Sequence, residues 1–244
     1  MLAAAAALLA SLPAAALARP RRTEPPLAAP GTLEVAGAAD AFYYEPKGRG
    51  GQLPVFVYLH GRSGNPADDC FKWAPVVRPH GWLLCPSGQE DRGLGARGWS
   101  NNWPAAQQVV DRSLAALLRK AGRRARARGN VLMGFSEGAY VAMNVGVREP
   151  ETFSRWLILA ANDVYWGGEG VAELRKNRAR VHRVYLLTGE RDEVVEASRR
   201  VFDTLDATRV HVVLRTPDDL GHEVPERRMR ELYDRPLRWL LGLR

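Results

Sequence analysis

The chain has 244 residues, of which 46% are hydrophobic, so it is long and apolar enough to build one sizeable α/β domain. Nothing in the composition indicates a second domain. The net charge of +8 suggests a nucleic-acid or membrane partner, but only four of the 35 basic residues are Lys and the excess of Arg is spread along the chain. We therefore expect no nucleic-acid binding.

The first residues have the pattern of an export signal. Residues 1–18 are almost wholly apolar and end in Ala16-Leu17-Ala18, a small-x-small pattern that signal peptidase recognises. The run is shorter than the about 20 residues of a spanning helix and contains Pro13. We expect cleavage before Arg19, export to the periplasm or medium, and no stable membrane insertion afterwards. No Lys or Arg precedes the run, so a misplaced start codon or a membrane anchor is the alternative.

The domain opens with short strands. Residues 19–31 are rich in Pro and Arg and are interpreted as an extended linker, which leaves residues 32–244 for the domain. Residues 33–35 and 41–44 are expected to be strands. Residues 53–59, LPVFVYL, are apolar on both faces, which is typical of a strand inside a parallel sheet.

A helix over residues 68–78 and a strand over residues 81–85 come next, and each carries one cysteine. Fourteen residues separate Cys70 from Cys85. In an exported chain a disulfide closing such a loop adds about 3 kcal/mol of stability. We expect this bridge, with two buried free thiols as the alternative.

A Trp- and Asn-rich segment precedes a long helix. Trp99, Asn101, Asn102 and Trp103 combine flat apolar area with amide donors, as in the wall of a substrate pocket, and Trp99, Asn102 and Trp103 are expected to contact the substrate. An equally good interpretation makes Asn101 or Asn102 the N-cap of the helix that follows. That amphipathic helix is expected over residues 105–128, and the basic residues near its end are interpreted as a solvated helix end.

A G-x-S-x-G pattern links the next strand and helix. Residues 131–133 form a short apolar run, and helical spacing begins after Gly138. A strand that turns directly into a helix crowds the backbone, so Gly134 and Gly138 relieve contacts on either side of Ser136. We expect the Ser136 hydroxyl to be exposed on this tight turn, at the positive end of the helix.

The remaining chain alternates strands and helices. Trp166 lies in a loop with a short helical piece and is a candidate to cover the site. Strands are expected at 155–160, 184–187 and 210–214, the loop at 164–183, and helices at 193–206 and at the end, up to about residue 241. This alternation predicts a mostly parallel sheet covered by helices on both faces.

Three residues follow predicted strands in the order nucleophile, acid, base. Ser136, Asp192 and His222 should meet at the carboxyl edge of one sheet. The other serine hydrolase designs carry these three residue types in a different order along the chain. Asp163, after the preceding strand, is the alternative acid. Glu190 and Glu193 are expected to be solvated.

With these residues the sequence resembles the α/β-hydrolase superfamily, nearest to the carboxylesterase/phospholipase (acyl-protein thioesterase-like) group of serine esterases. Residues from about 50 to the end carry its motifs. They are the H-G loop at His60-Gly61, the elbow at 134–138, the G-x-x-D-x-V-V loop at 189–195 and the G-H-E-V loop at 221–224. Glu137 departs from the group, where Gln is usual, and the 99–103 segment has no counterpart in it.

The resemblance implies an α/β-hydrolase fold with no large lid, and ester hydrolysis through an acyl-enzyme. Ser136 attacks, His222 takes its proton and Asp192 fixes the imidazole tautomer, while the backbone N–H groups of Arg62 and Glu137 hold the oxyanion. His60 is expected to be structural.

The implied partner is a small-molecule ester, and neither a cofactor nor a metal is expected. The extra carboxylate of Glu137 is expected to disfavour anionic substrates. A peptidase or thioesterase is the alternative function, and a non-catalytic exported binding protein is a further one. The oligomeric state is not predicted.

Overall fold

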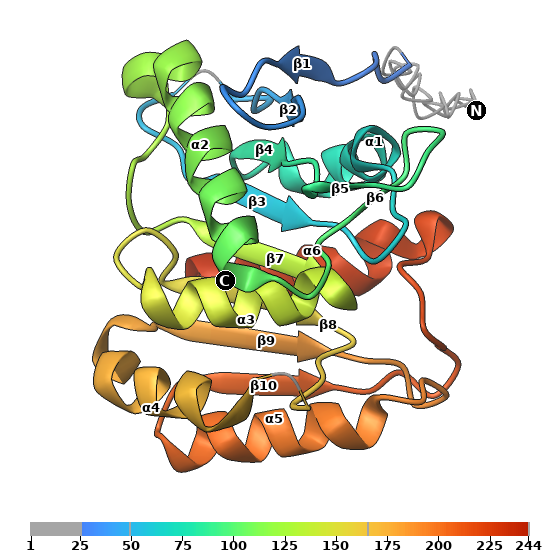
Figure 1. Cartoon of the computed structure of the whole chain (residues 1–244), viewed down its shortest axis with the longest axis vertical. Coiled ribbons are helices and arrows are strands. Elements are labelled where there is room, and N and C mark those ends of the chain that lie inside the picture. The colour runs from blue at the N-terminus through green and yellow to red at the C-terminus, as the bar shows by residue number, and fades with distance from the viewer. Residues whose placement is uncertain (1–25, 49, 165, 244) are drawn as a thin grey trace, which may run out of the picture.

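The computed structural model describes residues 26–48, 50–164 and 166–243, and its centre is an eight-stranded sheet (Figure 1). The strand order is β1-β2-β4-β3-β7-β8-β9-β10, and β5 and β6 form a separate two-stranded sheet. The strands are β1 (Gly31–Leu33), β2 (Ala41–Tyr44), β3 (Val55–Leu59), β4 (Trp82–Cys85), β5 (Glu90–Asp91), β6 (Arg97–Gly98), β7 (Val131–Phe135), β8 (Arg155–Leu159), β9 (Arg183–Leu187) and β10 (Val212–Arg215).

The sheet is mostly parallel, as predicted. Only β1 with β2 and β2 with β4 pair antiparallel, and the other neighbours are parallel. Along β3, Val55 and Val57 belong to the core on one face, whereas Phe56 and Tyr58 belong to the core on the other. This strand is buried on both faces, which explains its unbroken apolar sequence.

Helices cover both faces of the sheet (Figure 1). Residues of α2, α3, α4 and α5 pack into one core, and residues of α1 and α6 pack into the other. Among the described residues, no helix combines the length and the apolar character needed to cross a membrane. The helices are α1 (Pro66–Val77), α2 (Trp103–Ala121), α3 (Glu137–Arg148), α4 (Gly167–Asn177), α5 (Val195–Ala207) and α6 (Met229–Leu241), with 3₁₀ turns at Gly122–Arg124, Arg178–Arg180 and Glu226–Arg228.

The long helix α2 ends earlier than the predicted residue 128. Gly122 has a positive φ of 57°, which stops the helix. The next residues run beside the start of β3: the Leu53 N–H donates to Arg124 O (2.9 Å) and the Arg126 N–H donates to Leu53 O (2.9 Å). The helical prediction is wrong here because pairing with another segment replaces the helical hydrogen bonds.

The described part of the predicted linker packs against the domain. Leu27 contacts the core between the sheet and α1, and the Tyr44 hydroxyl donates to Ala28 O (2.6 Å). The first strand also begins at Gly31 rather than at residue 33. The predicted signal peptide, residues 1–18, lies outside the described residues.

The predicted disulfide is wrong in this structure. Cys70 of α1 and Cys85 at the end of β4 are free thiols, and both are fully buried. They pack as small apolar side chains in the core that α1 shares with the sheet. Burial raises the pKa of the Cys85 thiol, and a hydrogen bond with Cys70 raises it further. The alternative of two buried thiols therefore holds.

Candidate active site

Ser136 lies on the turn between β7 and α3. Its φ of 53° and ψ of −117° are sparsely populated for a residue with a Cβ. A Cβ on Gly134 would lie 2.3 Å from Gly138 O, and one on Gly138 would lie 2.1 Å from Leu59 O. The turn therefore requires glycine at both positions, as the sequence pattern predicted.

The structure brings Ser136, His222 and Asp192 into one hydrogen-bonded row. Nε2 of His222 is 3.0 Å from the Ser136 Oγ, and its Nδ1 is 2.8 Å from the Asp192 Oδ2. The Asp192 side chain is 1% exposed, and its Oδ1 accepts a hydrogen bond from the Val194 N–H (3.0 Å). A hydroxyl, an imidazole and a buried carboxylate in this order can activate the hydroxyl as a nucleophile.

Backbone hydrogen bonds fix the acid loop against the histidine loop. The Glu190 N–H donates to Pro217 O (2.8 Å) and the Arg191 N–H donates to Leu220 O (3.0 Å). A Cβ on Gly189 would lie 2.0 Å from Leu220 O, so only glycine allows this approach. The distance between Asp192 and His222 is thus set by main-chain contacts.

The alternative acid, Asp163, is occupied elsewhere. Its two carboxylate oxygens accept hydrogen bonds from Nε and Nη2 of Arg200 at 2.7 and 2.8 Å. These bonds lower the pKa of the Asp163 carboxyl. His222 is paired with Asp192 instead.

Two backbone N–H groups are candidates for an oxyanion hole. Glu137 is the first residue of α3, so its N–H has no acceptor within the helix. Arg62 follows the loop at Gly61, where an added Cβ would lie 3.5 Å from the Ser136 Cβ. Among the described residues, no backbone acceptor is found for either N–H. Both can donate to an oxyanion that forms beside Ser136.

His60 supports the loop from below, as predicted. The Gly88 N–H donates to its Nε2 (3.1 Å), so Nδ1 carries the proton and donates to Gly61 O (2.8 Å). The ring is 1% exposed, and burial lowers its pKa. A neutral imidazole bonded at both nitrogens is structural.

A cavity of about 300 Å³ opens at the serine. Its polar lining includes Asn101, from the Trp- and Asn-rich segment that was compared with a pocket wall, and also Asn162 and Glu193, which the sequence did not place in the site. Asn162 and Glu193 follow β8 and β9, so their position at the carboxyl edge of the sheet is the sequence signal that could have identified them. The lining consists of Arg62, Asn101, Ser136, Glu137, Tyr140, Ala160, Asn162, Glu193, Val194 and His222.

None of the four predicted substrate-binding residues lines this cavity. Trp99 is fully buried, and its indole N–H donates to His60 O (2.8 Å). Asn102 caps α2 by accepting from the Ala105 N–H (3.2 Å). Trp103 packs under the Arg148 guanidinium (3.8 Å to the ring centre), and Trp166 is buried in the core at the start of α4. These predictions are wrong because packing and capping occupy the side chains.

The carboxylate of Glu137 is not a free charge beside the serine. Its side chain is 3% exposed, and its Oε1 pairs with the Arg62 guanidinium (3.2 Å). The ion pair offsets the negative charge that was expected to disfavour anionic substrates.

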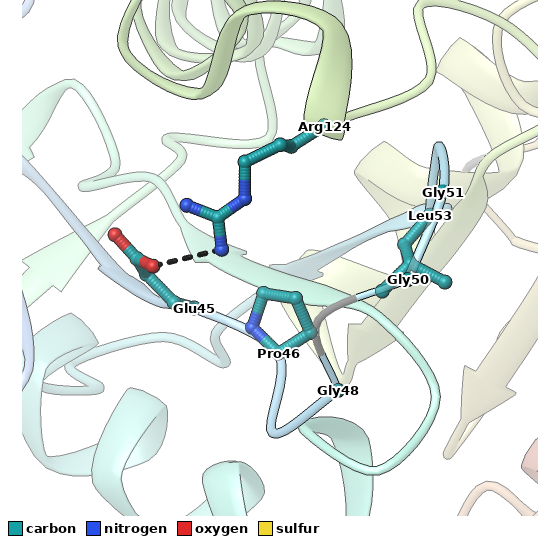
Figure 2. A pocket seen from close by; sticks show the side chains of 7 residues that line it. All are labelled: Glu45, Pro46, Gly48, Gly50, Gly51, Leu53 and Arg124. Atoms are coloured by element: carbon teal, nitrogen blue, oxygen red, sulfur yellow. Dashed lines mark hydrogen bonds and ion pairs between the residues drawn. The ribbon is translucent and has the colours of Figure 1, made fainter.

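A larger cavity, of about 410 Å³, lies at the other edge of the sheet, near the start of β3 (Figure 2). Among the described residues that line it, the charged ones are Glu45 and Arg124, which pair with each other at 3.0 Å. The described part of this lining contains no Ser, Cys or His, and its one carboxylate is paired with Arg124, so the size of the cavity does not indicate the site. Within the described residues, no group of three or more His, Cys, Asp or Glu side chains is placed to hold a metal ion.

A sequence model of the family named Esterase matches residues 41–219. This chain belongs to that family. The esterase is accordingly a carboxylic ester hydrolase. No curated protein is similar enough in sequence to match it.

Solved structures with the same fold include esterases and a peptidase. A carboxylesterase from Bacillus cereus shares 14% identity at a TM-score of 0.60 and covers 83% of this chain and 93% of its own. An S-formylglutathione hydrolase from Agrobacterium tumefaciens shares 17% identity at a TM-score of 0.63, and the match covers 83% of this chain and 89% of the hydrolase. An acylaminoacyl peptidase from Pyrococcus horikoshii shares 14% identity at a TM-score of 0.65, and the match covers 88% of this chain and 42% of the peptidase.

These neighbours establish the α/β-hydrolase fold. The esterase spans less than half of the peptidase, and 60% of a further neighbour, an uncharacterized protein from Bacillus cereus. Identities this low show the fold alone.

Proposed function

We propose that this esterase cleaves small or moderate carboxylic esters through a covalent acyl-enzyme on Ser136. The observation that carries the proposal is the row from the Ser136 Oγ through His222 to the buried carboxylate of Asp192, with spacings of 3.0 and 2.8 Å. No step of this chemistry requires a cofactor.

In the first half-reaction, His222 Nε2 accepts the hydroxyl proton as the Ser136 Oγ bonds to the ester carbonyl carbon. The carbonyl oxygen becomes an oxyanion, which accepts hydrogen bonds from the N–H groups of Arg62 and Glu137. The carbon–oxygen bond to the alcohol then breaks, and His222 returns its proton to the departing alkoxide. Asp192 holds the Nδ1 proton and stabilises the transient imidazolium.

In the second half-reaction, water replaces the alcohol. His222 takes a proton from the water as the water oxygen bonds to the acyl carbon. The bond to the Ser136 Oγ breaks, and the proton passes to that oxygen. The products are the free acid and the original enzyme, so atoms and protons balance over the cycle.

A peptidase is the second candidate, favoured by the acylaminoacyl peptidase among the structural neighbours. A thioesterase uses the same groups, because the fold hosts all three activities. A non-catalytic exported binding protein is the remaining alternative, and it gives no reason for a buried acid behind an imidazole that reaches the serine. Rates on p-nitrophenyl acetate, a p-nitroanilide and an acyl thioester separate the three activities.

The test of the mechanism is labelling with a fluorophosphonate, which reacts with an activated serine. We expect wild type to be labelled and to hydrolyse p-nitrophenyl acetate, and Ser136→Ala to lose both while keeping its circular dichroism spectrum. The matched control is Ser113→Ala, which removes a buried hydroxyl from α2. Hydrolysis by Ser136→Ala near the wild-type rate would refute the assignment of the nucleophile.

We also propose that the esterase is exported after cleavage before Arg19. The apolar residues 1–18 and the small-x-small sequence that ends them support this. The intact mass of protein recovered from the periplasm or medium should correspond to a chain that begins at Arg19. A mass that includes Met1 would refute the cleavage.

A further inference from the structure

The buried carboxylate of Glu137 joins three segments around the serine. Its Oε1 accepts hydrogen bonds from the Asn101 N–H (3.2 Å) and from Nη2 and Nε of Arg62 (3.2 and 3.3 Å). Its Oε2 accepts one from the Trp99 N–H (2.9 Å). The first turn of α3, the loop after β3 and the segment before α2 therefore meet on one side chain.

The segment 99–101 is held in an unfavourable backbone conformation. Ser100 and Asn101 have positive φ values of 50° and 47°, in the region that favours glycine. Two consecutive residues of this kind persist only where surrounding contacts impose them. Besides the bonds to Glu137, the Tyr140 hydroxyl donates to Asn101 O (3.2 Å), and the Trp99 indole is bonded below.

This segment forms one wall of the cavity at the serine. Asn101 lines the cavity, as do Arg62 and Glu137 themselves. The cavity of about 300 Å³ is at the lower end of the about 300–1,000 Å³ typical of ligand pockets. A long acyl chain that runs toward this side of the cavity would meet the wall.

We propose that Glu137 is a positioning residue that fixes the 99–101 wall and Arg62, and thereby restricts the esterase to short-chain substrates. The proposal rests on the ester hydrolysis proposed above. In this proposal a fixed wall, and not a movable lid, selects substrates by size.

The number of acceptors explains the acid at this position. Glu137 offers an acceptor to each of four donor groups with its two oxygens, whereas Gln has one oxygen. If that oxygen replaces Oε1, the bonds from Arg62 and Asn101 remain, but the amide N–H₂ faces the Trp99 N–H. Glu137→Gln should therefore hold the wall in part, and Glu137→Ala should release it.

The experiment compares kcat and KM for p-nitrophenyl acetate and p-nitrophenyl octanoate. We expect wild type to prefer acetate. In Glu137→Ala, kcat for acetate should fall about 100-fold, since small misplacements of catalytic groups cost this much. The ratio of acetate to octanoate kcat/KM should fall about 10-fold or more, as for other changes of pocket shape. The acetate-to-octanoate ratio of Glu137→Gln should lie between those of wild type and Glu137→Ala.

The matched control is Glu149→Ala, at the other end of α3, which removes a carboxylate bonded to Gln107 (3.1 Å). Its acetate-to-octanoate ratio should equal that of wild type. If Glu137→Ala does not fold, Tyr140→Phe tests the same wall, because it removes the hydroxyl at Asn101 O. That variant should lower the ratio without abolishing hydrolysis.

Two outcomes overturn the proposal: a wild type without preference for acetate, or a folded Glu137→Ala or Tyr140→Phe with the wild-type ratio. Failure of the proposed function is recognised separately, because Ser136→Ala would then retain hydrolysis whatever the chain-length ratio.

Discussion

Replacement of Asp192 by Asn should stop the chemistry without unfolding the esterase. The Asn Oδ1 can still accept from the Val194 N–H, which is 3.0 Å from this oxygen position in the structure. The new N–H₂ then occupies the position of Oδ2, 2.8 Å from His222 Nδ1. Nδ1 is also 3.0 Å from Oδ1, but that oxygen already accepts from the Val194 N–H, and the nearer neighbour of Nδ1 is now the amide group. Since two donors cannot face each other, we expect the tautomer in which Nδ1 accepts and Nε2 carries the proton.

In that tautomer Nε2 points a proton at the Ser136 Oγ, 3.0 Å away, and cannot accept one. We expect kcat for p-nitrophenyl acetate at pH 8 to fall by about 10⁴-fold, with KM little changed. Asp163→Asn is the control: it weakens an exposed ion pair with Arg200, which contributes little to stability, and should leave kcat unchanged. If Asp163→Asn loses activity and Asp192→Asn keeps it, the acid has been assigned to the wrong strand.

Two further predictions concern stability and the thiols. Gly138→Ala places a Cβ 2.1 Å from Leu59 O and should lower the free energy of unfolding in urea by about 3 kcal/mol or more, whereas Gly168→Ala, with nothing within 4 Å, should change it by at most about 1 kcal/mol. Equal midpoints for the two variants would contradict the crowded turn. Cys70 and Cys85 should resist iodoacetamide in the folded protein and both be alkylated in urea without reductant; a mass with neither modified would show a bridge.

The parts of the site that sequence alone predicted depend on the main chain. Ser136, Asp192 and His222 each follow a strand of a parallel sheet, so their meeting is a consequence of topology. The need for glycine at positions 134 and 138 could also be predicted, because a crowded turn excludes a Cβ whatever side chains surround it. The fold class and the structural role of His60 were also predicted correctly.

The lining of the cavity at the serine was not predicted, because it depends on which way side chains point. Trp99 and Asn102 were expected to bind substrate, but the indole is fully buried and the amide caps a helix. Asn101, between them, has a positive φ and does line the cavity. No periodic pattern distinguishes these three neighbours. The disulfide prediction failed for a similar reason, because the spacing of two cysteines along the chain does not show whether their sulfur atoms are bonded or only in contact.

The main-chain bonds between the acid loop and the histidine loop have a consequence for motion. The amide of Arg191 is bonded to Leu220 O, so this N–H can exchange with deuterated water only when the two loops separate. The same separation takes Asp192 away from His222. Protection of this one amide against exchange therefore reports the fraction of time for which the two loops, and with them Asp192 and His222, stay together.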